Sequence, residues 1–172
     1  WRILGPVWRG INNKKNLIED TYISAIRLQT YVATQFKPNV AKTIYQMTNA
    51  KKVLDTSCGW GDRLAGFFTS DAEEYIGCDP NPNTYERYMN QIETYNSFLS
   101  KPKKVKIYRC GAEDLPWHEI KDIDCAFTSP PYFSTEEYNK NGKYQEDQSW
   151  FKYKNYSGWA NDFFLPVAKN TF

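Results

Sequence analysis

The sequence predicts an α/β fold with a mostly parallel sheet and flanking helices. Short apolar runs alternate with helical patterns along residues 52–128, a glycine turn follows the first run, and acidic residues follow the next two. Alternating strands and helices favour parallel strands joined by right-handed crossovers. The chain has 172 residues, of which 41% are hydrophobic, so it is long enough for one domain with a substantial core.

The first part of the chain predicts two helices. Asp20 is suited to cap a helix that reaches Val32, and the segment Phe36-Lys37-Pro38 ends this pattern. Asn39 would then cap a second helix that reaches Met47.

The alternating part of the chain predicts four strands and two helices. Each strand is a short apolar run, and each helix repeats its apolar residues near the helical period. The strands are expected at 52–55, 75–78, 105–110 and 123–128, and the helices at 62–68 and about 83–99.

The pattern changes after residue 132. Lys, Asn, Tyr and Gln dominate up to Trp159, which predicts a long loop or lid. A final helix is expected at about 159–168, although Pro166 lies inside it. We therefore divide the chain into an N-terminal helical extension at 1–35, a core at 36–132 and a lid with its following helix at 133–172.

Composition limits the classes of protein that need to be considered. The net charge of +2 is too small to indicate nucleic-acid binding by itself, although the aromatic content of 17% offers surfaces for stacking on bases. The four cysteines show neither metal-ligand spacing nor a disulfide framework, so we expect reduced thiols, an intracellular protein and no metal. We expect no signal peptide and no membrane span, and the single histidine, His118, is more typical of a surface position than of a catalyst.

The turn after the first predicted strand is a candidate ligand-binding loop. Gly59 and Gly61 permit a tight turn and a close backbone approach to a ligand at the carboxyl end of the strand. A third glycine, expected for dinucleotide binding, is missing. Asp55 and Asp62 would repel a pyrophosphate and would suit a ligand that carries a positive charge and an amino group. An ordinary turn would also explain these glycines.

Acidic residues follow the second and third predicted strands. Asp79, about twenty residues after the glycine turn, could accept hydrogen bonds from both hydroxyl groups of a ribose, or could cap the turn at Pro80 and Asn81. Asp114 could accept a hydrogen bond from the amino group of an adenine, or could cap a helix.

The segment Ser129-Pro130-Pro131-Tyr132 follows the fourth predicted strand. The two prolines restrict the backbone, so the loop should hold its side chains at defined positions. Ser129 and the carbonyl of Pro130 could accept hydrogen bonds from an exocyclic amine, and Tyr132 could stack on the ring that carries it. By itself, this segment could also be an ordinary turn.

Taken together, these segments resemble the S-adenosylmethionine-dependent DNA amino-methyltransferases. The resemblance covers roughly residues 36–135 and rests on Val53–Gly61, Asp79, Asp114 and Thr128–Tyr132, with Phe36-Lys37-Pro38 upstream. It implies a Rossmann-like class I methyltransferase fold with S-adenosyl-L-methionine as cofactor. The implied cofactor-binding residues are Phe36, Lys37, Pro38, Asp55, Gly59, Gly61, Asp79 and Asp114, and the implied catalytic residues are Ser129, Pro130, Pro131 and Tyr132.

The sequence departs from the family pattern in two ways. Trp60 and Asp62-Arg63 replace small residues, which leaves the details of the methionine pocket open. The family's sheet has seven strands, whereas only four are recognisable here, so the fold would be incomplete in this chain. We expect a further segment or subunit to complete the sheet.

The resemblance also implies a substrate. A serine at the first position of the loop favours N4 of cytosine in DNA, with the target base flipped out of the duplex. Lysines and aromatic residues of the lid could contact DNA, or could fold over the site. Alternatives are N6-adenine methylation, methylation of RNA or a protein amide, and a catalytically silent module that binds nucleic acid. A cytoplasmic enzyme of restriction–modification would fit the favoured interpretation.

Overall fold

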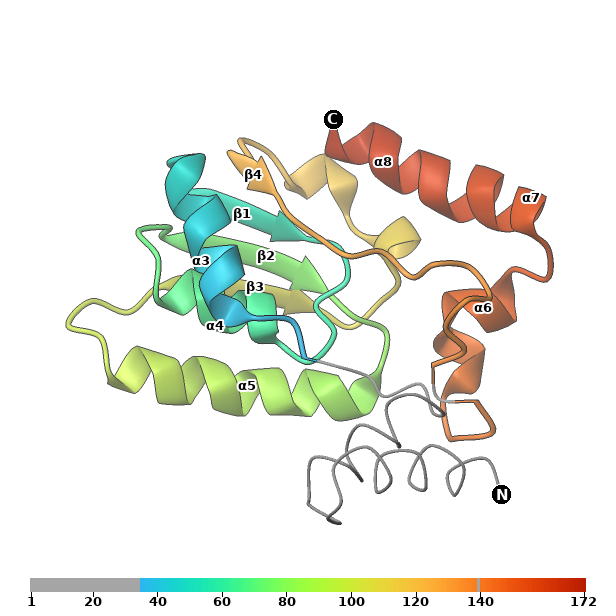
Figure 1. Cartoon of the computed structure of the whole chain (residues 1–172), viewed down its shortest axis with the longest axis horizontal. Helices are drawn as coiled ribbons and strands as arrows, with labels where there is room; N and C mark the ends of the chain where they lie inside the picture. The colour runs from blue at the N-terminus through green and yellow to red at the C-terminus, as the bar shows by residue number, and fades with distance from the viewer. Residues whose placement is uncertain (1–34, 139) are drawn as a thin grey trace, which may run out of the picture. The chain divides into compact units, whose positions relative to one another are not determined.

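A sheet of four parallel strands lies at the centre of the part of the chain that the computed structural model describes, residues 35–138 and 140–172. The strand order is β3-β2-β1-β4, so the chain moves outward from β1 to β3 and then crosses back to the other side of β1 (Figure 1). This reversal is typical of Rossmann-like sheets, and the predicted fold class is confirmed. The strands are β1 (Lys52–Asp55), β2 (Glu74–Cys78), β3 (Lys104–Tyr108) and β4 (Cys125–Ala126).

The residues Phe36–Phe172 form one compact unit. The helix predicted to begin at Asp20 lies outside the described residues, as does the predicted helical extension apart from Gln35. Within the described part of the chain, no helix has the length and hydropathy that a membrane span requires.

Helices cover both faces of the sheet. In β2, Tyr75 packs into a core that it shares with α3, α4 and α5, whereas Cys78 packs into a second core with η4 and α8. Because successive side chains of a strand point to opposite faces, these two cores lie on opposite faces of the sheet. The helices of the first core are α3 (Pro38–Met47), α4 (Asp62–Phe68) and α5 (Pro82–Ser97). Those after β4 are η3 (Gln145–Asp147), α6 (Ser149–Lys152), α7 (Tyr156–Gly158), the π-helical η4 (Trp159–Phe164) and α8 (Leu165–Thr171).

The start of α3 differs from the prediction. Lys37, not Asn39, is the N-cap, and Pro38 is the first helical residue. Proline suits this position because its fixed φ matches a helix and its missing N–H would have no partner there anyway. The segment Phe36-Lys37-Pro38 therefore leads into a helix.

The predicted strand at 123–128 is also shorter than expected, because only Cys125–Ala126 forms β4. Asp124 uses its carboxylate to accept hydrogen bonds from the backbone N–H groups of Lys51 and Lys52, at 2.9 and 2.7 Å. Among the described residues, β4 has no neighbour on its outer side.

The last predicted helix divides into two parts at Pro166. Pro166 lies in the first turn of α8, and the preceding turns, Trp159–Phe164, are π-helical. Proline has no N–H and its ring would clash with the carbonyl four residues earlier, so a wider turn before it relieves both problems. The predicted loop before this helix also contains the short helices η3, α6 and α7.

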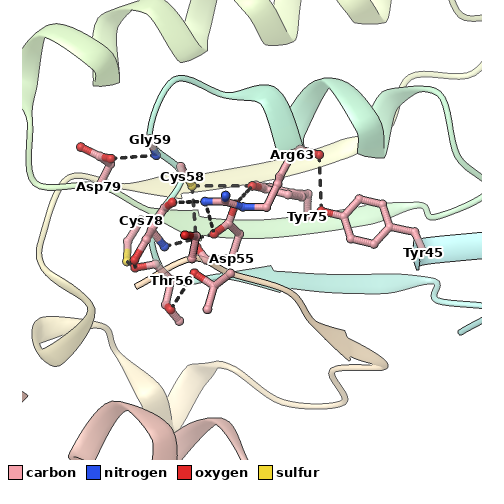
Figure 2. Close-up of polar contacts among 12 residues, drawn as sticks. Tyr45, Asp55, Thr56, Cys58, Gly59, Arg63, Tyr75, Cys78 and Asp79 are labelled. Carbon is pink, nitrogen blue, oxygen red and sulfur yellow. Dashed lines mark hydrogen bonds and ion pairs between the residues drawn. The ribbon is translucent and has the colours of Figure 1, made fainter. Parts of the chain in front are cut away.

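A buried ion pair joins β1 to α4. Arg63 donates from Nε to Oδ2 of Asp55 at 2.8 Å, and both side chains are almost fully buried (Figure 2). Burial opposes the charged form of Arg63, but the charge and hydrogen bonds of Asp55 outweigh this and raise the pKa of the guanidinium. The pair therefore stays ionised inside the first core, where each partner depends on the other.

We predict that Arg63→Met lowers the free energy of unfolding by about 3–5 kcal/mol, because it leaves a buried carboxylate without its partner. Urea denaturation followed by circular dichroism would measure this change. Arg87→Met, at an exposed position of α5, is the matched control and should change stability by less than about 0.5 kcal/mol. Equal effects of the two substitutions would contradict the prediction.

Candidate functional site

The predicted ligand-binding segments meet at one edge of the sheet. Because the four strands are parallel, the loops that follow them all leave from the carboxyl edge. The strand order reverses between β1 and β4, and a ligand crevice of an open α/β sheet is found at such a reversal. The glycine turn after β1 and the Ser129-Pro130-Pro131-Tyr132 loop after β4 lie on its two sides.

The glycine turn has a backbone that other residues adopt only with strain. Gly59 has φ of 59° and Gly61 has φ of 85°, and both values are left-handed. A side chain at Gly61 would also collide with that of Gln91 on α5. Gln91 Nε2 donates to the carbonyl of Trp60 at 3.3 Å, and the Tyr88 hydroxyl donates to the carbonyl of Gly59. Helix α5 thus holds the turn from outside.

The carboxylate of Asp55 is fully engaged within the protein. Oδ2 accepts hydrogen bonds from Arg63 Nε and from the Tyr75 hydroxyl, the latter at 2.6 Å. Oδ1 accepts from Arg63 Nη2 at 3.2 Å and from the N–H of Ser57 at 3.1 Å. Since a carboxylate offers about four acceptor positions, none is open. A direct contact with a cofactor stays a prediction that would require one of these donors to leave.

Arg63 also reaches the turn itself. Its Nη2 donates to the carbonyl of Ser57, so one guanidinium fixes both the end of β1 and the start of the loop. The Asp55 charge is therefore balanced inside the protein, and the expectation that it faces a cationic ligand is weakened.

Asp79 lies between β2 and the glycine turn. Its Oδ2 accepts a hydrogen bond from the N–H of Gly59 at 2.9 Å (Figure 2). Its Oδ1 accepts from the N–H of Asn81 at 2.9 Å and from the Thr84 hydroxyl at 3.1 Å. Burial raises the pKa of Asp79, and these donors oppose that shift. Three of about four acceptor positions are filled, so Asp79 caps its turn and still has one position for a ligand.

The upstream segment contacts the start of α4 and Phe127, the residue that follows β4. The Asp62 carboxylate accepts a hydrogen bond from the backbone N–H of Phe36; burial raises its pKa, an effect that Arg63 and this hydrogen bond oppose. The Phe36 ring packs edge-on against Phe127, with centroids 5.8 Å apart, and the Arg63 guanidinium lies 5.8 Å from its centroid. Lys37 and Pro38 are exposed.

Asp114 follows β3 in the short helix η1 (Ala112–Asp114), which lies ahead of η2 (Trp117–Glu119). Its side chain is 64% exposed and lies 3.6 Å from Lys152 Nζ. The neighbouring Glu113 is more buried and accepts hydrogen bonds from Lys152 at 3.0 Å and from the Tyr153 hydroxyl at 3.3 Å. These contacts tie the segment after β4 to the loop after β3.

The Ser-Pro-Pro-Tyr loop presents two polar groups at the surface. Ser129 Oγ and the Tyr132 hydroxyl lie 3.2 Å apart, within hydrogen-bond distance, and both residues are exposed. Pro130 and Pro131 between them are partly buried. The Tyr132 side chain is 53% exposed, so part of its ring is available for stacking.

Phe133 anchors the end of this loop. Its φ of 48° is rare for a bulky residue. Its ring packs against Tyr156 and Trp159, with centroids 5.9 and 6.1 Å away. The ring is therefore engaged with α7 and η4, and these contacts hold the strained backbone in place.

Several lysines of the predicted lid have partners inside the protein. Lys140 pairs with Glu137, Lys152 pairs with Glu113, and Lys154 lies 3.8 Å from the centroid of the Phe151 ring. A role of these lysines in neutralising phosphates would compete with such contacts. In residues 35–138 and 140–172, no group of three or more His, Cys, Asp or Glu could hold a metal ion.

No protein-family profile matches the chain, and no curated protein sequence matches it either. Two solved structures that match in three dimensions are methyltransferases. One is a candidate caffeoyl-CoA O-methyltransferase from Staphylococcus aureus, with 16% identity, a TM-score of 0.40, and coverage of 64% of this chain and 51% of that chain. The other is the SAH-bound Podospora anserina methyltransferase PaMTH1, with 12% identity, a TM-score of 0.43, and coverage of 73% and 50%. The chain thus spans about half the length of these structures, and likeness at such identity does not extend to activity.

Two contributions to the site were not foreseen from the sequence. In the sequence, Arg63 is recognisable only as a departure from the small residues of the family pattern, although a charge inside the apolar pattern of 62–68 is a signal for a buried partner. The bond from Thr56 Oγ1 to Thr128 Oγ1, at 3.1 Å, had no signal in the sequence because it depends on the register between β1 and β4.

Two thiols lie beside the loops after β2 and β3. The neighbouring Cys110 thiol, together with burial, raises the pKa of Cys78, whereas the Cys78 thiol lowers the pKa of Cys110. Cys78 is buried and Cys110 is partly exposed.

We therefore predict that iodoacetamide alkylates Cys110 before the buried cysteines Cys58, Cys78 and Cys125. Peptide mass spectrometry over a time course at pH 8 would measure the order. Faster alkylation of any of the three buried cysteines would contradict the prediction.

Proposed function

We propose that this protein is an S-adenosylmethionine-dependent methyltransferase that acts on the exocyclic amino group of a DNA base, preferentially N4 of cytosine. The observation that carries this proposal is the direct bond between the two loops at the sheet reversal. Thr56, in the glycine-containing loop, donates to Thr128, next to Ser129-Pro130-Pro131-Tyr132. A cofactor loop and an acceptor loop in such contact suit a reaction between two bound molecules.

The residues on the cofactor side fit S-adenosylmethionine in part. Gly59 leaves the backbone of the turn open to close approach, since a Cβ atom there would meet only the Ser57 carbonyl oxygen, at 3.9 Å, whereas Gly61 faces Gln91. Asp79 keeps one acceptor position suited to a ribose hydroxyl. Asp114 is exposed and could accept from an adenine amino group. Asp55 contributes by shaping the loop, because its own acceptor positions are filled. When bound, S-adenosylmethionine supplies a methyl group on a positively charged sulfur.

The residues on the acceptor side would activate the amine by position and electrostatics. The lone pair of an exocyclic amine is delocalised into its ring, so the amine is a poor nucleophile. Ser129 Oγ and the Pro130 carbonyl accept its hydrogen bonds and favour the tetrahedral geometry in which the lone pair is free. Tyr132, with its exposed ring, stacks on the base.

The Ser129-Pro130-Pro131-Tyr132 loop also bears on the identity of the substrate. Ser129 at the first position of the loop favours N4 of cytosine over N6 of adenine. A duplex target requires the base to be flipped, which costs a few kcal/mol that stacking on Tyr132 would offset. Transfer to RNA or a protein amide is the alternative, as is a silent module that binds nucleic acid. We infer a cytoplasmic role such as restriction–modification, and a further segment or subunit beside β4.

We predict that the protein transfers label from S-adenosylmethionine to DNA and that nucleoside digestion yields N4-methylcytosine. Ser129→Ala should lower kcat by about 100-fold, because it removes one of two acceptors for the amine, and should leave cofactor affinity nearly unchanged. Radiolabel transfer and calorimetry would measure the two effects.

Ser134→Ala is the matched control, since Ser134 is an exposed serine just beyond the loop. If the digestion yields N6-methyladenine instead of N4-methylcytosine, the target base is adenine. Label in RNA or protein without label in DNA would contradict the proposal, and cofactor binding without any transfer would favour the silent module.

Asp79→Ala should weaken cofactor binding by about tenfold or more, because it removes a ribose acceptor and releases the N–H of Gly59. Calorimetric titration with S-adenosylmethionine would measure the affinity. Thr84→Val removes one donor to Asp79 but keeps the carboxylate, so its effect should be smaller. Unchanged affinity of Asp79→Ala would rule out the ribose assignment.

A further inference from the structure

The hydroxyl bond between Thr56 and Thr128 continues the pairing of β1 with β4 beyond the end of both strands. In the ladder, Val53 is opposite Cys125 and Leu54 is opposite Ala126. The N–H of Phe127 still bonds to the carbonyl of Leu54, at 2.9 Å. Two residues after Leu54 and two after Ala126, the same register brings Thr56 opposite Thr128. Their side chains, 3.1 Å apart between Oγ atoms, provide a link where the regular ladder has ended.

Thr56 is itself held from several directions. Its side chain is buried, and its carbonyl accepts a hydrogen bond from the Cys78 thiol at 3.3 Å (Figure 2). The same carbonyl accepts a hydrogen bond from the Ser57 hydroxyl at 2.7 Å. The next residues are fixed by Arg63 at the Ser57 carbonyl and by Cys78 at the N–H of Cys58. Thr56 is thus a rigid point on the cofactor side.

Thr128 lies at the start of the acceptor loop, which has fewer restraints than the cofactor loop. β4 has only two residues in the ladder and forms the outer edge of the sheet among the described residues. Beyond Thr128, the loop reaches Phe133 and its aromatic contacts before it is anchored again. Between these anchors, Ser129 and Tyr132 bond only to one another in the side-chain contacts described.

We propose that the Thr56–Thr128 pair is a positioning device that fixes the acceptor loop relative to the cofactor loop. The hydroxyl of Thr56 sets where Thr128 lies, and Thr128 sets the direction in which Ser129 leaves the sheet. Neither hydroxyl touches the reacting atoms in this role. The consequence for catalysis rests on the proposed function, but the effect on the loop itself does not.

Threonine-to-valine substitutions in the full chain test this proposal, since valine keeps the shape and removes the hydroxyl. The first measurement is hydrogen exchange of peptides that span residues 127–133, without any ligand. Thr56→Val and Thr128→Val should each speed exchange in the loop severalfold, and the double variant should be no faster than the single ones. Thr43→Val is the control, because Thr43 bonds only to the carbonyl of Asn39 in its own exposed helix turn.

The second measurement separates turnover from binding. Each single variant should lower kcat about tenfold and keep the dissociation constant for S-adenosylmethionine within about twofold, and the double variant should match the single ones. A merely structural role would lower the melting temperature and affinity together with kcat.

Unchanged loop exchange in both variants, or effects that multiply in the double variant, would overturn the proposal. If Thr56→Val fails to fold, loop exchange in Thr128→Val alone decides whether the pair positions the loop. Thr128 is only partly buried, so its substitution should be tolerated. Absence of cofactor binding by the unaltered chain would instead contradict the proposed function, and the exchange result would still decide the role of the pair.

Discussion

The ion pair between Asp55 and Arg63 is the interaction on which the arrangement at the sheet edge depends. Asp55 ends β1, Arg63 is the second residue of α4, and the guanidinium also holds the carbonyl of Ser57. Strand, loop and helix are therefore fixed relative to one another by one side chain. Because both charges are buried, the pair cannot be loosened without leaving a charge unsolvated.

From this centre, hydrogen bonds extend outward to each neighbouring strand. Tyr75 connects Asp55 to β2, Asp79 connects the end of β2 to Gly59, and Thr56 connects β1 to the loop after β4. The backbone of the glycine turn is thus held by side chains from several elements. A loop restrained in this way loses little entropy when a ligand binds to it.

The two sides of the site differ in how firmly they are held. The proposed cofactor side is enclosed by β1, β2, α4 and α5, whereas the proposed acceptor loop follows a two-residue strand at the edge of the sheet. Its fixed points are the bond of Thr128 to Thr56 and the packing of Phe133 on Tyr156 and Trp159. Exposure of Ser129 and Tyr132 suits a partner that must enter and leave.

The sequence alone determined the α/β class, the helix 62–68 to the residue and the four strand positions, because apolar periodicity and glycine turns are local signals. It also identified Asp79 and Ser129–Tyr132 as residues that follow strands. Only the tertiary structure decided that Asp55 bonds Arg63 and Tyr75, that Pro38 begins a helix, and that Thr56 meets Thr128. These features depend on strand register and on which helix covers which face, and residues up to 72 positions apart carry no local trace of such contacts.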